Sequence, residues 1–284
     1  MRMQIVFSLA AAALVLAQAP LVAQPTNVIT PQKPARELMQ RVQAKVDAGK
    51  TSESDYADDL KAFDRLIADA GTNHDEAAQV TYMKGALYLQ VIRNGDKAVE
   101  IFKQLKENYP DTIYGQNAGR ILPMIETQAA AQKIQDNLAP GSVFPDFAAN
   151  DLDGKALSVS ALKGKVVLVD FWATWCAPCR AELPNVIATY KKHHGEGFEI
   201  IGVSLDSKRA ELESFLKDHP DMAWPQFFDG TGADEPNWKN RLAVKYGVQA
   251  IPATILVDGD GKILGKNLRG EELENAVSAA VAKK

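Results

Sequence analysis

The stretch that most constrains the fold is a β-branched, mostly apolar run from Val166 to Phe171, followed by Trp-Ala-Thr-Trp-Cys-Ala-Pro-Cys-Arg at residues 172–180. The run has the length and composition of a buried strand, and the cysteines stand where a helix is expected to begin. Cys176 and Cys179 are the only two cysteines among 284 residues. We therefore expect the rest of this domain to present these two sulfurs.

The C-terminal half of the chain alternates between short apolar runs and helical patterns. A break at Ala139-Pro140-Gly141 marks the change and predicts a domain boundary near residue 138, so that 139–284 form one domain. The pattern predicts strands at 165–171, 198–204, 225–228, 253–257 and 262–265, and helices at 176–194, 207–218, 236–246 and 270–282. Such alternation is typical of βαβ units and indicates an α/β fold with helices on both faces of a central sheet.

The first 23 residues have the pattern of a secretory signal peptide. Arg2 precedes an apolar segment from Ile5 to Ala17, and Leu21-Val22-Ala23 forms a cleavage site before Gln24. The alternative is a retained membrane anchor, although a transmembrane helix needs roughly 20 apolar residues. We expect an exported protein, periplasmic or otherwise outside the cytosol. Disulfides persist there, but a bond that closes a four-residue loop stabilises a fold weakly, which favours a chemical role for the cysteines.

The region between the signal peptide and the α/β domain is predicted to be helical. Residues 24–35 are rich in proline and predict a mobile leader, and the periodicity over 36–137 predicts an all-α domain of about five helices. Residues 79–112 resemble one tetratricopeptide-type repeat, with small residues that let two helices pack closely, and 113–131 are a candidate degenerate copy. The alternatives are an ordinary helical hairpin and a module that binds a partner protein or dimerises.

A Cys-x-x-Cys pair beside a βαβ pattern is typical of a redox dithiol. At a helix N-terminus, free N–H groups and the helix dipole favour a thiolate, so Cys176 is expected to be the attacking sulfur. Cys179, one turn inside the helix, is then the resolving thiol. A zinc site needs further ligands, and the four histidines show no ligand spacing, so we expect neither a metal nor another cofactor. The formal charge of −4 and dispersed Lys and Arg residues argue against nucleic acid as a partner.

Several motifs in this order resemble the thioredoxin fold, and specifically the exported thiol:disulfide oxidoreductases of the TlpA/ResA/DsbE-like group. The resemblance covers residues 139–284, about half of the chain. It rests on Pro140-Gly141-x-x-Phe144-Pro145-Asp146-Phe147, Trp175-Cys-Ala-Pro-Cys-Arg180, Glu182-Leu183-Pro184, Tyr246-Gly247-Val248 and Ile251-Pro252. It implies a thioredoxin-like fold with a mixed sheet, preceded here by the all-α domain.

The resemblance also implies a surface that binds an extended substrate. Ile251-Pro252 corresponds to a cis peptide that packs against the disulfide and exposes backbone groups with which a substrate chain can pair. Without the resemblance, a proline before a strand is a routine edge or turn device. Trp175 and Pro178, beside the cysteines, complete the expected substrate-binding residues.

Two acids are candidate proton carriers. Asp170 matches the buried acid of thioredoxin itself, at a position where the exported relatives often carry an amide. Glu182 matches the acid typical of the exported group, so this chain holds both, although a plain helix-surface role is the alternative for Glu182. Our hypothesis is that one of them takes the proton from Cys179.

The predicted function is that of an exported thiol:disulfide oxidoreductase that reduces disulfide-containing proteins and so contributes to cell redox homeostasis. Its electrons are expected from a membrane thiol-transferring protein, and its helical domain is expected to recruit a partner or to self-associate. One alternative is a thiol peroxidase of the peroxiredoxin kind, although the run 171–176 lacks the proline of a Pro-x-x-x-Thr-x-x-Cys site. The other is a helical scaffold whose thioredoxin-like domain only binds.

Overall fold

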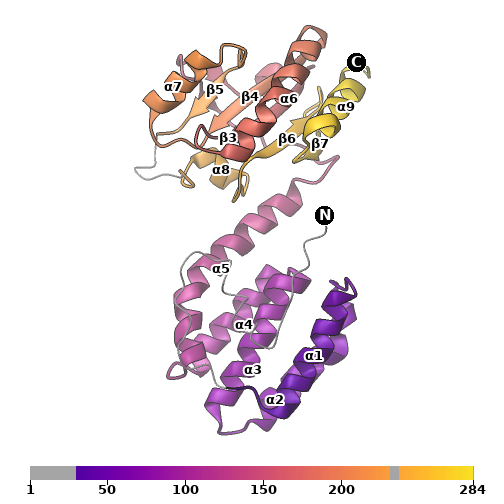
Figure 1. Cartoon of the computed structure of the whole chain (residues 1–284), viewed down its shortest axis with the longest axis vertical. Coiled ribbons are helices and arrows are strands. Elements are labelled where there is room, and N and C mark those ends of the chain that lie inside the picture. Colours follow the sequence, from indigo (N-terminus) through magenta and orange to yellow (C-terminus); the bar gives the residue numbers. More distant parts are fainter. Residues whose placement is uncertain (1–29, 231–236, 284) are drawn as a thin grey trace. The chain divides into compact units, whose positions relative to one another are not determined.

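The computed structural model describes residues 30–230 and 237–283 and divides into two compact units, Met1–Ala129 and Ala130–Lys284 (Figure 1). The predicted signal peptide at 1–23 lies outside the described residues. The division falls inside helix α5 (Ile113–Asn137), not near residue 138. Ile134, on the last turns of α5, packs against the core of the second unit, so the break at Ala139-Pro140-Gly141 marks the end of the helix and not the end of the unit.

The first unit is helical, as the periodicity predicts. Its helices are α1 (Lys33–Asp47), α2 (Ala57–Asp69), α3 (His74–Leu87), α4 (Gly95–Asn108) and the first part of α5, with a short 3₁₀ turn at Glu53–Tyr56 and a π turn at Tyr88–Ile92. Helix α1 begins at Lys33, inside the predicted leader 24–35. Pro34 occupies the first turn of this helix, where the missing N–H has no intrahelical partner to lose.

Helices α3 and α4 form the helical hairpin predicted over 79–112. Gly85 lies against the second helix so closely that a Cβ there would be 2.9 Å from Cε2 of Phe102, and Phe102 is almost fully buried. Residues 113–131 do not form a second hairpin, because they belong to the single helix α5.

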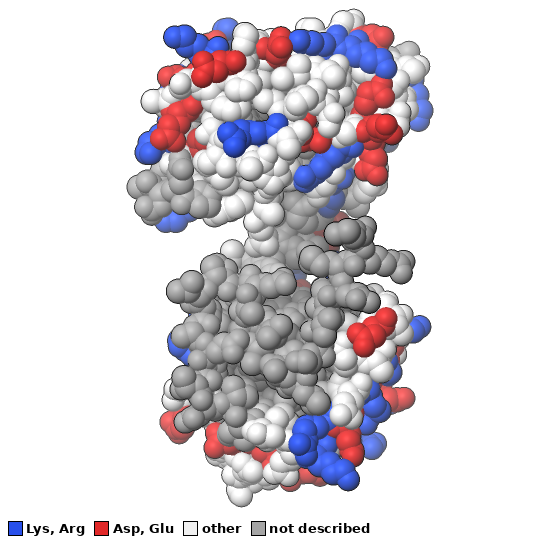
Figure 2. Space-filling model, viewed as in Figure 1, with Lys and Arg blue, Asp and Glu red and all other residues white. Residues whose placement is uncertain are grey.

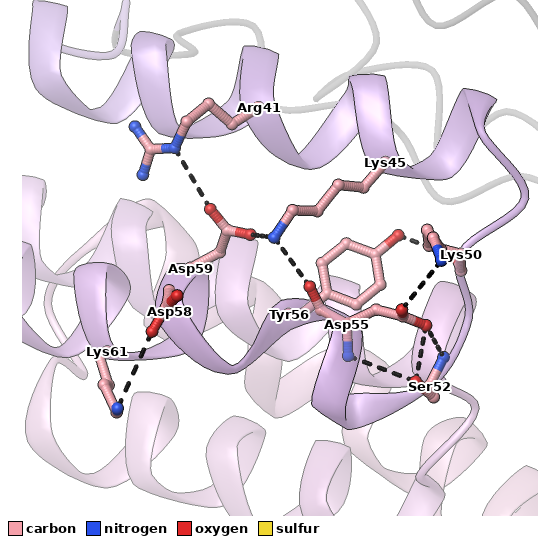
Figure 3. A network of polar contacts seen from close by, with 9 residues as sticks. All are labelled: Arg41, Lys45, Lys50, Ser52, Asp55, Tyr56, Asp58, Asp59 and Lys61. Atoms are coloured by element: carbon pink, nitrogen blue, oxygen red, sulfur yellow. Dashed lines mark hydrogen bonds and ion pairs between the residues drawn. The ribbon is translucent and has the colours of Figure 1, made fainter.

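A buried carboxylate joins α1 to α2 (Figure 3). Asp59 is 2% exposed, and its two oxygens contact Arg41 Nε at 3.3 Å and Lys45 Nζ at 2.6 Å. Lys45 also donates to the Asp55 carbonyl and lies over the ring of Tyr56. A buried carboxylate is tolerated only when it is paired, so these two cations fix the register of α1 on α2.

The second unit is built on a five-stranded mixed sheet in the order β5-β4-β3-β6-β7. The central strand β3 pairs in parallel with β4, which pairs in parallel with β5, while β6 runs antiparallel to β3 and to β7. The strands are β3 (Val166–Trp172), β4 (Phe198–Ser204), β5 (Gln226–Phe228), β6 (Ala253–Val257) and β7 (Ile263–Lys266), and a small hairpin of β1 (Ala149–Asn150) and β2 (Ala156–Leu157) precedes them. Every residue of β3 is buried, which explains its nearly unbroken apolar sequence.

Helices α6 (Ala177–His193), α7 (Arg209–Asp218), α8 (Arg241–Lys245) and α9 (Gly270–Val281) complete this unit. Helices α6 and α9 lie side by side on one face of the sheet (Figure 1). The helix predicted at 236–246 is shorter than expected: it begins only at Arg241, because the Asn240 side chain caps it by accepting from the amides of Leu242 and Ala243. The mixed sheet confirms the thioredoxin-like fold that the resemblance implies.

An aromatic cluster on the opposite face of β3 explains two of the sequence motifs. The ring of Tyr246 stacks on Phe144 at 5.0 Å between centroids and contacts the edges of Phe147 and Phe171. Its hydroxyl donates to the Pro145 carbonyl at 2.7 Å. The segment 144–147 and the segment that begins at Tyr246 are therefore parts of one core.

The surface carries charges of both signs. On the face of the second unit seen in Figure 2, acidic and basic side chains are interspersed. Within residues 30–230 and 237–283, no helix combines the length and apolar character that a membrane span requires.

Candidate active site

The two cysteines form a disulfide at the start of α6. Their sulfurs are 2.02 Å apart and their Cα atoms 5.3 Å apart. Cys176 is the N-cap residue of α6, and its Sγ accepts a hydrogen bond from the Cys179 amide at 3.2 Å. Pro178 stands between them in the first turn and has no N–H to offer, so the Cys179 amide is the donor that the cap uses. Once the bond is reduced, this placement favours a thiolate on Cys176.

The loop that carries Cys176 is held by a residue that the motif analysis missed. Asp206, which is fully buried after β4, accepts from the Thr174 hydroxyl at 2.6 Å, from the Thr174 amide at 3.1 Å and from the Ser204 hydroxyl at 2.7 Å. Strands β3 and β4 are parallel, so their carboxyl ends meet at one edge of the sheet. That rule, applied to an acid just beyond the strand predicted at 198–204, is the signal that could have found Asp206.

Asp170 and Glu182 meet at one small cavity beside Cys179. Its volume is about 20 Å³, enough for roughly one water molecule. The cavity is lined by Asp170, Trp172, Cys179, Glu182, Leu183, Val186, Pro252, Thr254, Leu268 and Arg269. The two candidate proton carriers therefore line the same cavity as Cys179.

Asp170 lines this cavity and is buried, with 8% of its surface exposed. Burial away from water and the neighbouring Glu182 carboxylate raise the pKa of Asp170 from 3.8 to about 7, while the positive charge of Arg269 acts in the opposite direction. A carboxyl group with a pKa near 7 can both accept and release a proton at neutral pH.

Glu182 has a second role besides lining the cavity. One of its carboxylate oxygens accepts from the Gly270 amide at 2.6 Å, at the first residue of α9, and the other accepts from the Asn185 side chain at 3.1 Å. Glu182 is thus a helix-capping residue as well as a neighbour of Asp170. It does not lie on a plain solvated helix surface.

The substrate-binding candidates are placed in two groups. The Ile251–Pro252 peptide bond is cis, as the resemblance implies, and Pro252 lines the cavity with Cys179. Trp175, 37% exposed, and the exposed Pro178 lie on the surface around the disulfide and do not line the cavity. Sequence reasoning missed Arg269, whose guanidinium donates to the Pro252 carbonyl. No local motif marks it.

Comparison with known proteins agrees with this geometry. Residues 140–265 match the AhpC/TSA family. The chain is 30% identical over 149 residues to a thiol-disulfide oxidoreductase ResA of Bacillus thuringiensis subsp. konkukian (strain 97-27), and the match covers 52% of this chain and 80% of the relative. A ResA of Bacillus subtilis (strain 168) is 30% identical over 130 residues, which cover 46% of this chain and 68% of that relative.

Among solved structures, a thiol:disulfide interchange protein from Bacteroides sp. is 37% identical, with a TM-score of 0.44, and the match covers 51% of this chain and 92% of that chain. The family match over residues 140–265 includes the disulfide at the start of α6. The chain belongs to the ResA-like family of thioredoxin-fold thiol-disulfide oxidoreductases.

Proposed function

We propose that this protein is an exported protein-disulfide reductase that works through the Cys176–Cys179 dithiol. The observation that carries the proposal is the disulfide at the N-terminus of α6, with an ionisable carboxyl group in the cavity behind Cys179. Export is supported by the pattern of residues 1–23, and reduction as the direction by the resemblance to the exported group. Disulfide-containing proteins are the proposed substrates.

The proposed first step is attack by the Cys176 thiolate on one sulfur of a substrate disulfide. A mixed disulfide forms between Cys176 and the substrate, and the other substrate sulfur leaves as a thiolate. Trp175, Pro178, Ile251 and Pro252 are the proposed docking residues, with the backbone beside the cis proline pairing with an extended substrate segment.

The proposed second step is attack by Cys179 on the Sγ of Cys176. Asp170, directly or through one water in the cavity, takes the proton from the Cys179 thiol, with Glu182 beside it. The substrate leaves with both sulfurs reduced, and the protein is left with the disulfide described above. Two electrons must then return from a donor, for which a membrane thiol-transferring protein is proposed.

The helical unit is proposed to recruit a partner protein or to self-associate, in the manner of a tetratricopeptide-like module. The support is the α3–α4 hairpin with its close approach at Gly85. This role is separate from the chemistry, because every residue of the candidate site lies within Ala130–Lys284.

One set of assays on the purified full chain tests the proposed function. Insulin reduction with dithiothreitol as electron source, the Cys176–Cys179 reduction potential and hydrogen peroxide consumption are measured on the same sample, with Cys176→Ser as the control. We expect insulin reduction that disappears in C176S. Fast peroxide turnover without disulfide reduction would instead identify a thiol peroxidase, and inactivity in both assays would identify a binding scaffold.

A further inference from the structure

The cavity beside Cys179 is bounded by four elements, and one of them brings in a positive charge. Strand β3 contributes Asp170, and α6 contributes Cys179 and Glu182. From β6 and the residue before it come Thr254 and Pro252, which carry no titratable group, and the segment before α9 contributes Arg269. Arg269 is therefore the cation that faces Asp170 among the lining residues.

Arg269 also contacts the cis peptide segment Ile251–Pro252, which holds two of the proposed docking residues. Its guanidinium donates a hydrogen bond to the carbonyl of Pro252, the second residue of the cis peptide. The next residue, Gly270, donates its amide to Glu182 at 2.6 Å. Arg269 and Gly270, at the start of α9, thus bind Pro252 of the cis peptide and Glu182 of the cavity.

We propose that Arg269 is a positioning residue of this site, which anchors the Pro252 carbonyl and, through its charge, holds the Asp170 carboxyl group in the range where it exchanges protons with Cys179. This inference rests on the proposed function, because it assigns Asp170 the proton transfer.

The electrostatic reason follows from the three effects on Asp170. Burial and the Glu182 carboxylate both disfavour the ionised form of Asp170, and Arg269 favours it. Without the guanidinium charge, the pKa of Asp170 rises above about 7, and a smaller fraction of the protein carries the base at neutral pH. Because Arg269 is exposed, water screens much of its effect. We expect a shift on the order of half a pH unit in the Asp170 midpoint, which is about a threefold change in the proton equilibrium.

The test compares Arg269→Gln, which removes the charge but keeps a side-chain donor, with Arg269→Lys, which keeps the charge. The Asp170 carboxyl is titrated by ¹³C nuclear magnetic resonance in the oxidised full chain, a readout that does not depend on activity. The rate of disulfide reduction in a single turnover is then measured from pH 5 to pH 9. Lys262→Gln, at an exposed turn of the same unit, is the matched control for loss of one positive charge.

We expect the Asp170 midpoint to move upward in R269Q, with the reduction rate about threefold lower at pH 6 and equal at pH 9. R269K and K262Q should keep the wild-type midpoint. An unmoved midpoint in R269Q, or an equal shift in R269K, overturns the role of Arg269. A second outcome separates the two proposals. If the Asp170 midpoint shifts as expected but the wild-type reduction rate does not follow that midpoint, the proposed proton transfer by Asp170 is wrong. The effect of Arg269 on the Asp170 titration then still holds.

Discussion

Asp170 lies on the fully buried central strand, yet it lines a cavity together with Cys179, Glu182 and Arg269. Burial and the neighbouring Glu182 carboxylate raise the pKa of Asp170 to about 7, which suits proton exchange but lowers the stability of the fold. Between pH 3.8 and about 7, the folded protein keeps a proton that the unfolded chain releases. The stability of the fold therefore falls as the pH rises through this window.

We predict that Asp170→Asn stabilises the oxidised protein at pH 8. Asn has no proton to lose, so the gain in the free energy of unfolding should be largest above pH 7, with an upper bound of about 4 kcal/mol. This gain should vanish near pH 4, where Asp170 is protonated in the folded protein. Urea unfolding at pH 4, 6 and 8 measures the difference. Equal stability of the two proteins at pH 8 would show that the buried carboxyl is not destabilising in its ionised form. The same variant should slow the release of reduced substrate.

At the scale of single residues, sequence patterns located the groups that belong to a local motif. Cys176 and Cys179 lie at the start of α6, Glu182 lies one turn later, and Asp170 lies six residues before Cys176 on β3. Arg269 was missed because it reaches the cavity only through the folded arrangement of α9 beside α6, which no local spacing encodes.

The loop between β3 and α6 is an element whose shape depends on a buried hydrogen-bond network. Thr174 donates twice to Asp206, which in turn accepts from Ser204 at the end of β4. We predict that Thr174→Val destabilises the protein by about 1–3 kcal/mol, because a fully buried carboxylate loses a donor. Thr174→Ser keeps the hydroxyl and should remain within about 0.5 kcal/mol of wild type.

Thermal and urea unfolding of both variants checks this assignment. A T174V protein as stable as T174S would mean that the Thr174 hydroxyl contributes nothing to holding the loop before Cys176. The accompanying loss in the rate of disulfide reduction should follow the same order, with T174S close to wild type.

Element types were predictable along most of the chain, and element ends were not. The strands predicted at 198–204 and 253–257 match β4 and β6, because short apolar runs between turn signals usually form buried strands. Pro34 was interpreted as part of a leader although proline also suits a first helical turn. The helix at 236–246 was overestimated because the cap at Asn240 depends on side-chain geometry and not on apolar periodicity.

At the scale of the whole molecule, the described residues form two separate hydrophobic cores, one in each unit. The boundary between the units could not be predicted from composition, because helix α5 continues across it and its last turns belong to the second core. Since the candidate site lies entirely in the second unit, damage to the helical core should leave the chemistry intact.

We predict that Gly85→Ala destabilises the helical unit without changing the reduction of a small disulfide. The new Cβ would lie 2.9 Å from the buried Phe102 ring. Such overpacking typically costs about 1–3 kcal/mol, of which the helix propensity of alanine offsets about 1 kcal/mol. Gly119→Ala is the matched control, since a Cβ there meets only Lys106 at 3.7 Å and gains about 1 kcal/mol of helix propensity. Calorimetry and the reductase assay measure both effects. Loss of small-disulfide reduction in a folded G85A protein would show that the units are coupled in catalysis.

The proposed attack by Cys176 is tested most directly by finding which cysteine forms the mixed disulfide with a substrate. Reduced Cys179→Ser and Cys176→Ser proteins are each mixed with a peptide disulfide, and the covalent adduct is located by mass spectrometry. We expect a stable mixed disulfide on Cys176 in C179S and little adduct in C176S, because the helix start favours the thiolate at Cys176. An equal or faster adduct on Cys179 in the C176S protein would contradict the proposed attack by Cys176.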